Sequence, residues 1–185
     1  VVRRIAGRSV TGVLSVLAVD AANADQTAAP PSADAARRVP GFVRDHDTMV
    51  RARYPLIYLV SWEEQRLDVV LEDLARGHGR TLHVWSVTQG LRKVDGARYV
   101  PPLDGTKDPV EGRAQVRKLS EPALVVIKDF HPFLNDAVIV RSLRELCHHL
   151  KTTYTTVVLV SPTLQIPAEL VKEISVLDVP LPDAT

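Results

Sequence analysis

Three polar residues, Lys128, Asp129 and Ser161, directly follow short apolar runs of the chain. The first two come after Ala123–Ile127, and the third comes after Thr156–Val160. The ends of parallel strands meet at one crevice, and in nucleoside triphosphatases an aspartate at such a strand end holds magnesium. The spacing therefore makes these three residues candidates for binding a nucleotide.

The phosphate-binding half of such a site is missing from the sequence. After a first strand, Leu56–Val60, the pattern G-x-x-x-x-G-K-[ST] would wrap phosphates with backbone amides and a lysine. This chain has Ser61-Trp62-Glu63-Glu64 there, and no other segment matches the pattern. Ser61 and Glu64 have the spacing of a capping box, which predicts that the following helix satisfies its own first amides. We therefore expect no catalytic residue, no cofactor and no ATP hydrolysis by this chain alone.

Structural roles also account for the candidate residues. Phe130 stands where a catalytic glutamate often follows the magnesium-binding aspartate. Asp129 can instead fix the loop after its strand, while Phe130 and Phe133 close the core. Ser161 begins Ser161-Pro162-Thr163, which is typical of a simple turn. For Asp129 and Ser161 the structural role is the favoured interpretation.

The elements that position these residues alternate along the chain. Short apolar runs predict strands at residues 56–60, 81–87, 123–127, 156–160 and 174–179. Apolar positions spaced three and four apart, with their flanking residues, predict helices at residues 67–74, 109–119, 136–150 and 167–173. Residues 90–108 are rich in Gly and Pro and are predicted to form a loop. The pattern predicts an α/β fold with a mainly parallel sheet of about five strands flanked by helices, like a degenerate nucleoside-triphosphatase domain.

The first 44 residues differ in composition from the rest. Residues 20–41 are rich in Ala, Asp and Pro and are predicted to be a disordered linker. Within residues 1–24, three arginines, the apolar stretch Val10–Val19 and Ala22-Asn23-Ala24 outline a secretory signal. Polar residues in and after that stretch weaken the outline, so a poorly structured leader is the favoured interpretation. The folded domain is predicted to span residues 45–185.

The composition argues against several classes of function. The formal net charge is +1, which gives no support for nucleic acid or an anionic membrane as a partner. The sequence contains no run of about 18 apolar residues, so no membrane span is predicted. The single Cys147 excludes an internal disulfide and a multi-thiolate zinc site, and its helical position predicts that it packs in the core. His148 and His149 are adjacent, so they do not form a metal pair. A cytoplasmic location is expected.

Five segments in order carry a family resemblance: Arg51–Glu64, Val84–Leu91, Ile127–Leu134, Leu159–Pro162 and Ile174–Pro182. They are similar to the N-terminal domain of a family of AAA-type ATPases, the plastid-encoded and bacterial open-reading-frame family. The resemblance spans residues 49–182, although residues 111–119 are more polar than the family's corresponding helix. The end of the chain just after the last segment fits a domain edge or a truncated reading frame.

The resemblance implies a domain that is part of an ATPase. The phosphate loop, ATP and magnesium would belong to an AAA module beyond this chain. The implied partners are that module or neighbouring subunits of an ATPase assembly.

The sequence leaves three functional hypotheses. The favoured one is a non-catalytic N-terminal domain that acts as an interaction or regulatory module. The second is an ATP-binding protein that uses Asp129 with an atypical phosphate site. The third is an exported binding protein, which rests on Ala22-Asn23-Ala24 alone.

Overall fold

The parallel strands form the centre of the molecule. The structure, a computed structural model, describes residues 41–95, 98–102 and 104–179. Within these residues the strand order of the sheet is β4-β3-β2-β5-β6-β1-β7. The parallel strands, in spatial order, are β2 (Thr81–Ser86), β5 (Ala123–Lys128), β6 (Thr156–Ser161), β1 (Leu56–Val60) and β7 (Ile174–Asp178). The prediction of a mainly parallel α/β fold is confirmed.

Residues 90–108 were predicted to form a loop, and this prediction is wrong where two strands form, whereas the described residues from 100 to 108 do form a loop. β3 (Gly90–Asp95) and β4 (Arg98–Tyr99) extend the sheet in antiparallel direction beyond β2. The apolar signal of β3 is short because this strand lies next to the sheet edge, with only the two-residue β4 beyond it, and buries few side chains. In β3 Leu91 is fully buried, whereas Arg92, Lys93 and Val94 are half-buried.

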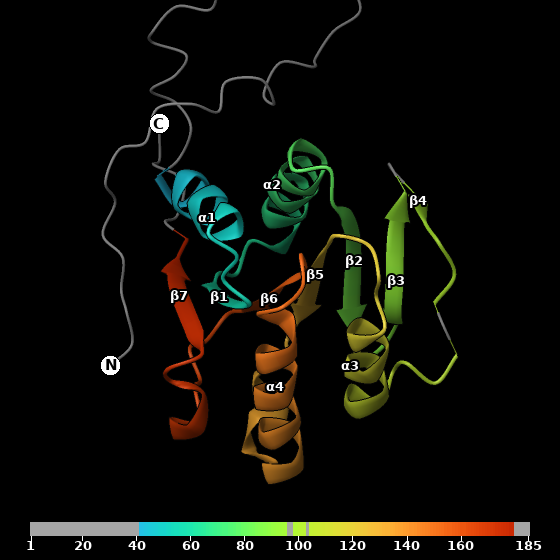
Figure 1. The fold of residues 1–185 in the computed structure, drawn as a ribbon, viewed down its shortest axis with the longest axis vertical. Helices are drawn as coiled ribbons and strands as arrows, with labels where there is room; N and C mark the ends of the chain where they lie inside the picture. Colours follow the sequence, from blue (N-terminus) through green and yellow to red (C-terminus); the bar gives the residue numbers. More distant parts are fainter. Residues whose placement is uncertain (1–40, 96–97, 103, 180–185) are drawn as a thin grey trace, which may run out of the picture.

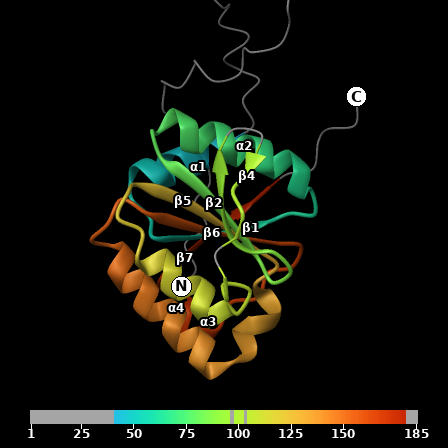
Figure 2. The ribbon, with the colours of Figure 1, turned by 90° about the vertical axis from the view of Figure 1, so that its right-hand side faces the viewer.

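Among the described residues, four α-helices cover the two faces of the sheet (Figure 1). α1 (Gly41–Arg51) and α2 (Glu64–Gly77) lie on one face, and α3 (Pro109–Arg117) and α4 (Ala137–Leu150) lie on the other (Figure 2). The predicted apolar stripe of α4 is buried at all of its positions, Ile139, Leu143, Leu146 and Leu150. α1 was not predicted. It begins at Gly41, so residues 41–44 of the predicted leader are helical and the domain starts before the expected boundary at residue 45. Residues 1–40, which include the predicted signal at residues 1–24, lie outside the described residues.

Two short 3-10 helices also lie in the part of the chain that the structure describes. η2 (His131–Asn135) leads from β5 into α4, and η3 (Ala168–Leu170) lies in the connection from β6 to β7. A helix was predicted at residues 167–173, but only this single turn forms, and Pro167 precedes it. The connection from β6 to β7 therefore contains a shorter helical segment than α3 or α4.

Strand alternation divides the core into two apolar clusters. In β1, Leu56 and Tyr58 pack with α4 and η3 residues, whereas Ile57 and Leu59 pack with α1 and α2 residues. Successive side chains of a strand point to opposite faces, so each parallel strand contributes to both clusters.

The connectivity creates one topological switch point. From β1 the chain crosses through α2 to β2, and from β6 it crosses over β1 to β7 on the other side. The carboxyl ends of β1 and β6 are therefore neighbours from which the chain departs in opposite directions. In open α/β sheets this is the position where ligands bind.

Candidate functional site

The loop from β1 to α2 closes against the neighbouring strand at the switch point. The backbone N–H of Ser61 donates to the carbonyl of Ser161 at 3.0 Å, which continues the pairing of β1 with β6. The Ser61 Oγ accepts the backbone N–H of Glu63 at 3.0 Å. Only Ser61, Trp62 and Glu63 separate β1 from α2.

The predicted capping box at Ser61 and Glu64 is wrong. The N-cap residue of α2 is Glu63, and its own side chain makes no capping hydrogen bond to the first turn of the helix. Ser61 bonds the amide of Glu63 because the tight loop brings its hydroxyl to that amide first. The Glu63 carboxylate accepts a hydrogen bond from Arg66 at 2.7 Å instead of reaching back to the backbone.

Lys128 lies against α2. Its Nζ is 2.7 Å from the Asp68 carboxylate and 3.3 Å from the Glu64 carboxylate. Burial by itself lowers the pKa of Lys128, but hydrogen bonds and charge from Asp68 and Glu64 outweigh it and raise the pKa above its ordinary value. Lys128 therefore stays charged, and its ammonium group is paired with the α2 carboxylates of Asp68 and Glu64.

Ser161 lies on the opposite face of the sheet. Its side chain is 1% exposed, and its Oγ is 3.1 Å from Nδ1 of His131 in η2. Lys128 contacts α2, whereas Ser161 contacts the segment that leads into α4. The sheet therefore separates two of the three candidates.

Asp129 lies at the edge between these two residues. It is exposed, has a φ of 51°, and donates its backbone N–H to the Val160 carbonyl at 2.9 Å. Phe130 follows it into the core and packs edge-on against Trp85, with 5.6 Å between ring centroids. The predicted closing role of the phenylalanine is confirmed. Nucleotide binding by the candidate residues stays a prediction.

The prediction that Cys147 packs in the core is confirmed. Cys147 is buried, and burial raises the pKa of its thiol to about 12, so it is not a nucleophile at neutral pH. Among the residues described, no group of three or more His, Cys, Asp or Glu side chains could hold a metal ion. No helix in the same part of the chain has the length and apolar content needed to cross a bilayer.

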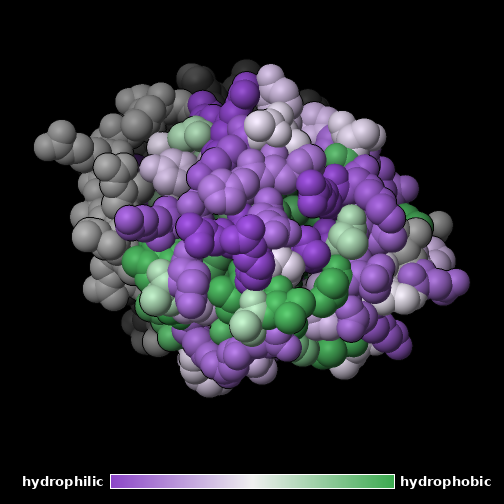
Figure 3. All heavy atoms as spheres, turned by 60° about the horizontal axis from the view of Figure 1, so that its bottom comes forward, coloured by the Kyte–Doolittle hydropathy of each residue, from purple (hydrophilic) through white to green (hydrophobic). Residues whose placement is uncertain are grey.

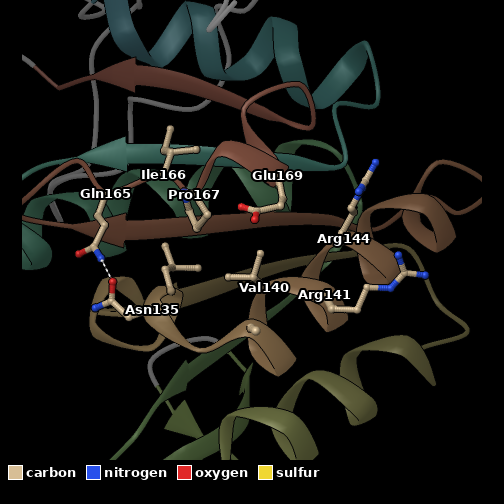
Figure 4. Close-up of a pocket in the computed structure, with 10 residues that line it drawn as sticks. Asn135, Val140, Arg141, Arg144, Gln165, Ile166, Pro167 and Glu169 are labelled. Carbon is tan, nitrogen blue, oxygen red and sulfur yellow. Dashed lines mark hydrogen bonds between the residues drawn. The ribbon is translucent and has the colours of Figure 1, made fainter.

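A groove lies beside α4, and sequence reasoning missed it. It has a volume of about 520 Å³ and separates α4 and η2 from residues 165–169 (Figure 4). Its apolar lining includes Leu134, Val140, Ile166 and Pro167, and Arg141 and Arg144 lie at one end. The groove depends on the short crossover after β6, and the sequence instead predicted a longer helix at residues 167–173.

Trp62 is a second feature without a predicted role. It is 76% exposed in the β1–α2 loop, although tryptophan is a large and mostly apolar residue. Sequence reasoning treated this loop only as a helix start.

Comparison with known proteins decides the family. The model of the family described as "SpoVK-like AAA ATPase, N-terminal domain" matches residues 42–179. The chain belongs to this family. The match covers all the described strands and nearly all of α1, so it supports the predicted N-terminal domain of an AAA ATPase.

Relatives of this SpoVK-like N-terminal domain are longer proteins. The protein of Guillardia theta named "Uncharacterized AAA domain-containing protein ycf46" is 32% identical over 145 residues, covering 76% of this chain and 28% of the relative. The protein of the same name from Trieres chinensis is 31% identical over 139 residues, covering 72% of this chain and 27% of the relative. The chain thus spans less than a third of these relatives.

Solved structures give a distant likeness. A chain in the structure of Drosophila ORC bound to AT-rich DNA and Cdc6 has a TM-score of 0.38 and 9% identity, covering 80% of this chain and 61% of that one. A match at this level supports no inference about ligands or partners.

Proposed function

We propose that this SpoVK-like N-terminal domain is a non-catalytic interaction module of a longer AAA-type ATPase, with a degenerate phosphate-loop fold. The observation that carries the proposal is the β1–α2 connection. Three residues join the strand to the helix, and the first of them is bonded to β6. A connection this short leaves no backbone to wrap a phosphate.

The charges at the same position support the proposal. Glu63 and Glu64 lie at the start of α2, where a bound phosphate needs positive potential. Lys128, the nearest candidate for contacting phosphate, is paired with Asp68 and Glu64. A nucleotide would have to displace both carboxylates from the lysine while its own phosphates faced Glu63.

The proposed partner is the ATPase part of the longer protein or a neighbouring subunit of the same assembly. The family match and the length of the relatives support this proposal. We also propose a cytoplasmic location, with which the free, buried Cys147 is compatible.

Thermal unfolding with and without ATP and magnesium tests the proposal. We expect the Tm of the full chain to be unchanged at about 5 mM ATP. A site with a Kd a hundredfold below that concentration would instead stabilise the folded state by about 2.7 kcal/mol and raise the Tm by several degrees. A single cooperative transition shows that the tested domain is folded.

Two variants make the thermal experiment specific. A Tm increase that is lost in Asp129→Ala but kept in Asp73→Ala would contradict the proposal and support the atypical nucleotide site. Asp73 is a surface acid on α2 that pairs with Arg76, so it controls for the loss of one negative charge.

A further inference from the structure

The groove beside α4 is held open by contacts on both sides. The Gln165 side chain donates to Asn135 at 2.8 Å and closes one end (Figure 4). The buried Tyr58 hydroxyl donates to the Thr163 carbonyl at 2.7 Å, which ties the groove's wall to β1. Lys151 at the end of α4 pairs with Glu173 at 2.7 Å. These contacts make the groove a preformed site.

The groove combines apolar walls with a positive end. On the face seen in Figure 3, hydrophobic surface gathers in a band bordered by hydrophilic surface. At one end the lining has Arg141 and Arg144, opposed by Glu169 on the other wall. Arg141 is 69% exposed and pairs with Glu145 four residues along the helix, a type of surface pair that contributes little stability. Arg141 can therefore accept a second carboxylate, and Arg144 at the same end of the groove is exposed.

The β1–α2 loop has the complementary chemistry. Trp62 projects into solvent and is followed by the acidic residues Glu63 and Glu64. The Ser61 backbone and hydroxyl bonds hold the base of the loop, so Trp62 is presented on a fixed support. Tryptophan is enriched among the residues that dominate binding energy at protein interfaces. Glu63 pairs with Arg66, and Glu64 pairs with Lys128 at 3.3 Å. Both carboxylates are partly exposed, and Lys128 keeps Asp68 as its closer partner, so both acids can exchange partners at small cost.

We propose that Trp62 of one copy of this chain inserts into the groove beside α4 of a second copy. The indole contacts the apolar walls, and the acidic residues that follow it face Arg141 and Arg144. A groove of about 520 Å³ is within the range that encloses a ligand larger than an indole ring. The loop and the groove are different surfaces, so each copy offers one of each and can join a reciprocal dimer, a ring or a longer chain. This self-association specifies the neighbouring-subunit contact of the proposed function, so it rests on that proposal, and its test is separate from the nucleotide experiment.

Analytical ultracentrifugation of the full chain from about 10 µM to 1 mM tests the contact. We expect the average mass to rise with concentration. Trp62→Ala should weaken association by roughly 30-fold or more, the loss typical of an interface hot spot. The double variant Arg141→Glu/Arg144→Glu should weaken it similarly, and association of the unaltered chain should decline at high salt.

Matched controls use the same kinds of substitution elsewhere. Tyr154→Ala removes an aromatic residue that is 56% exposed in the loop between α4 and β6. Arg76→Glu reverses an arginine that pairs with Glu72 on α2, as Arg141 pairs with Glu145 on α4. Both controls should associate like the unaltered chain. Circular dichroism confirms that every variant is folded.

Mixing two variants gives the decisive result. Trp62→Ala keeps the groove, and the double arginine variant keeps the tryptophan. Each should be monomeric alone at about 100 µM, and together they should form a one-to-one complex. A chain that stays monomeric up to 1 mM, association unchanged by Trp62→Ala, or a mixture with no complex would overturn the proposal.

Discussion

At the scale of single residues, His46 is unusual because its imidazole is buried. Its side chain is 1% exposed on α1, and its Nε2 has no hydrogen-bond partner in the described part of the protein. Burial, with a smaller contribution from the charge of His78, lowers the pKa of His46 from 6.5 to about 3. The folded domain therefore holds this imidazole neutral throughout the mildly acidic range.

Folding stability should fall as the pH drops below 6.5. There the unfolded chain binds a proton at His46 that the folded chain excludes, which costs up to about 1.4 kcal/mol per pH unit until the pH nears the folded pKa. Urea unfolding should show a free energy of unfolding about 1 kcal/mol lower at pH 5.5 than at pH 7.5. His46→Leu should reduce this difference. Equal pH dependence in both proteins would show that His46 is not its source.

The sequence identified the polar residues at the ends of the strands but not the side chains that they contact. Lys128 and Ser161 both follow apolar runs, yet the alternation of strand side chains sends the lysine toward α2 and the serine toward His131. The lysine's partners Asp68 and Glu64 come from a helix about 60 residues earlier in the chain, a pairing that no local pattern reveals. The sequence therefore predicted which residues lie at the carboxyl ends of the strands, but it did not predict which side chains these residues contact.

At the scale of elements, α3 depends on a close approach to β2. The Trp85 indole N–H donates to the Thr106 carbonyl at 2.6 Å, directly beneath Gly112 of α3. A Cβ built at Gly112 would lie 2.5 Å from Trp85 Nε1 and 2.9 Å from the Thr106 carbonyl oxygen. Glycine has a low helix propensity, yet Gly112 is the residue that lets this helix pack against β2.

Gly112→Ala should destabilise the domain by about 2 kcal/mol because the added methyl group collides with the indole and a backbone oxygen. Helix propensity alone predicts the opposite, a gain of about 1 kcal/mol. Chemical denaturation followed by tryptophan fluorescence measures the change. Ala114→Gly, on the same helix, is the control and should cost about 1 kcal/mol through propensity. A stabilised Gly112→Ala variant would contradict the packing argument.

Elements with strong local signals were predicted and those without were missed. β5 is wholly apolar before Lys128, and α4 has both its buried stripe and its Asp136 cap, whose carboxylate accepts the amides of Val138 and Ile139. β3 alternates too briefly to be distinguished from a loop, and its place is set by pairing with β2. Edge strands and short crossovers are decided by tertiary contacts, which explains why the groove beside α4 was not foreseen.

At the scale of the whole molecule, the fold is a mainly parallel α/β sheet in which a short loop closes the edge at the switch point. At the switch point between β1 and β6, a three-residue loop is hydrogen-bonded to β6. Lys128, at the end of the neighbouring strand, is paired with Asp68. The exposed features, Trp62 and the groove beside α4, are suited to contacts between proteins. This contrast underlies the proposal that the SpoVK-like N-terminal domain is an interaction module.

Isothermal titration calorimetry of the full chain with ATP and magnesium tests the central claim most directly. The account predicts no saturable heat at high protein concentration, in a sample whose cooperative melting shows that the domain is folded. Saturable binding that disappears in Asp129→Ala would contradict the account and make the end of β5 a nucleotide site that works without a phosphate loop.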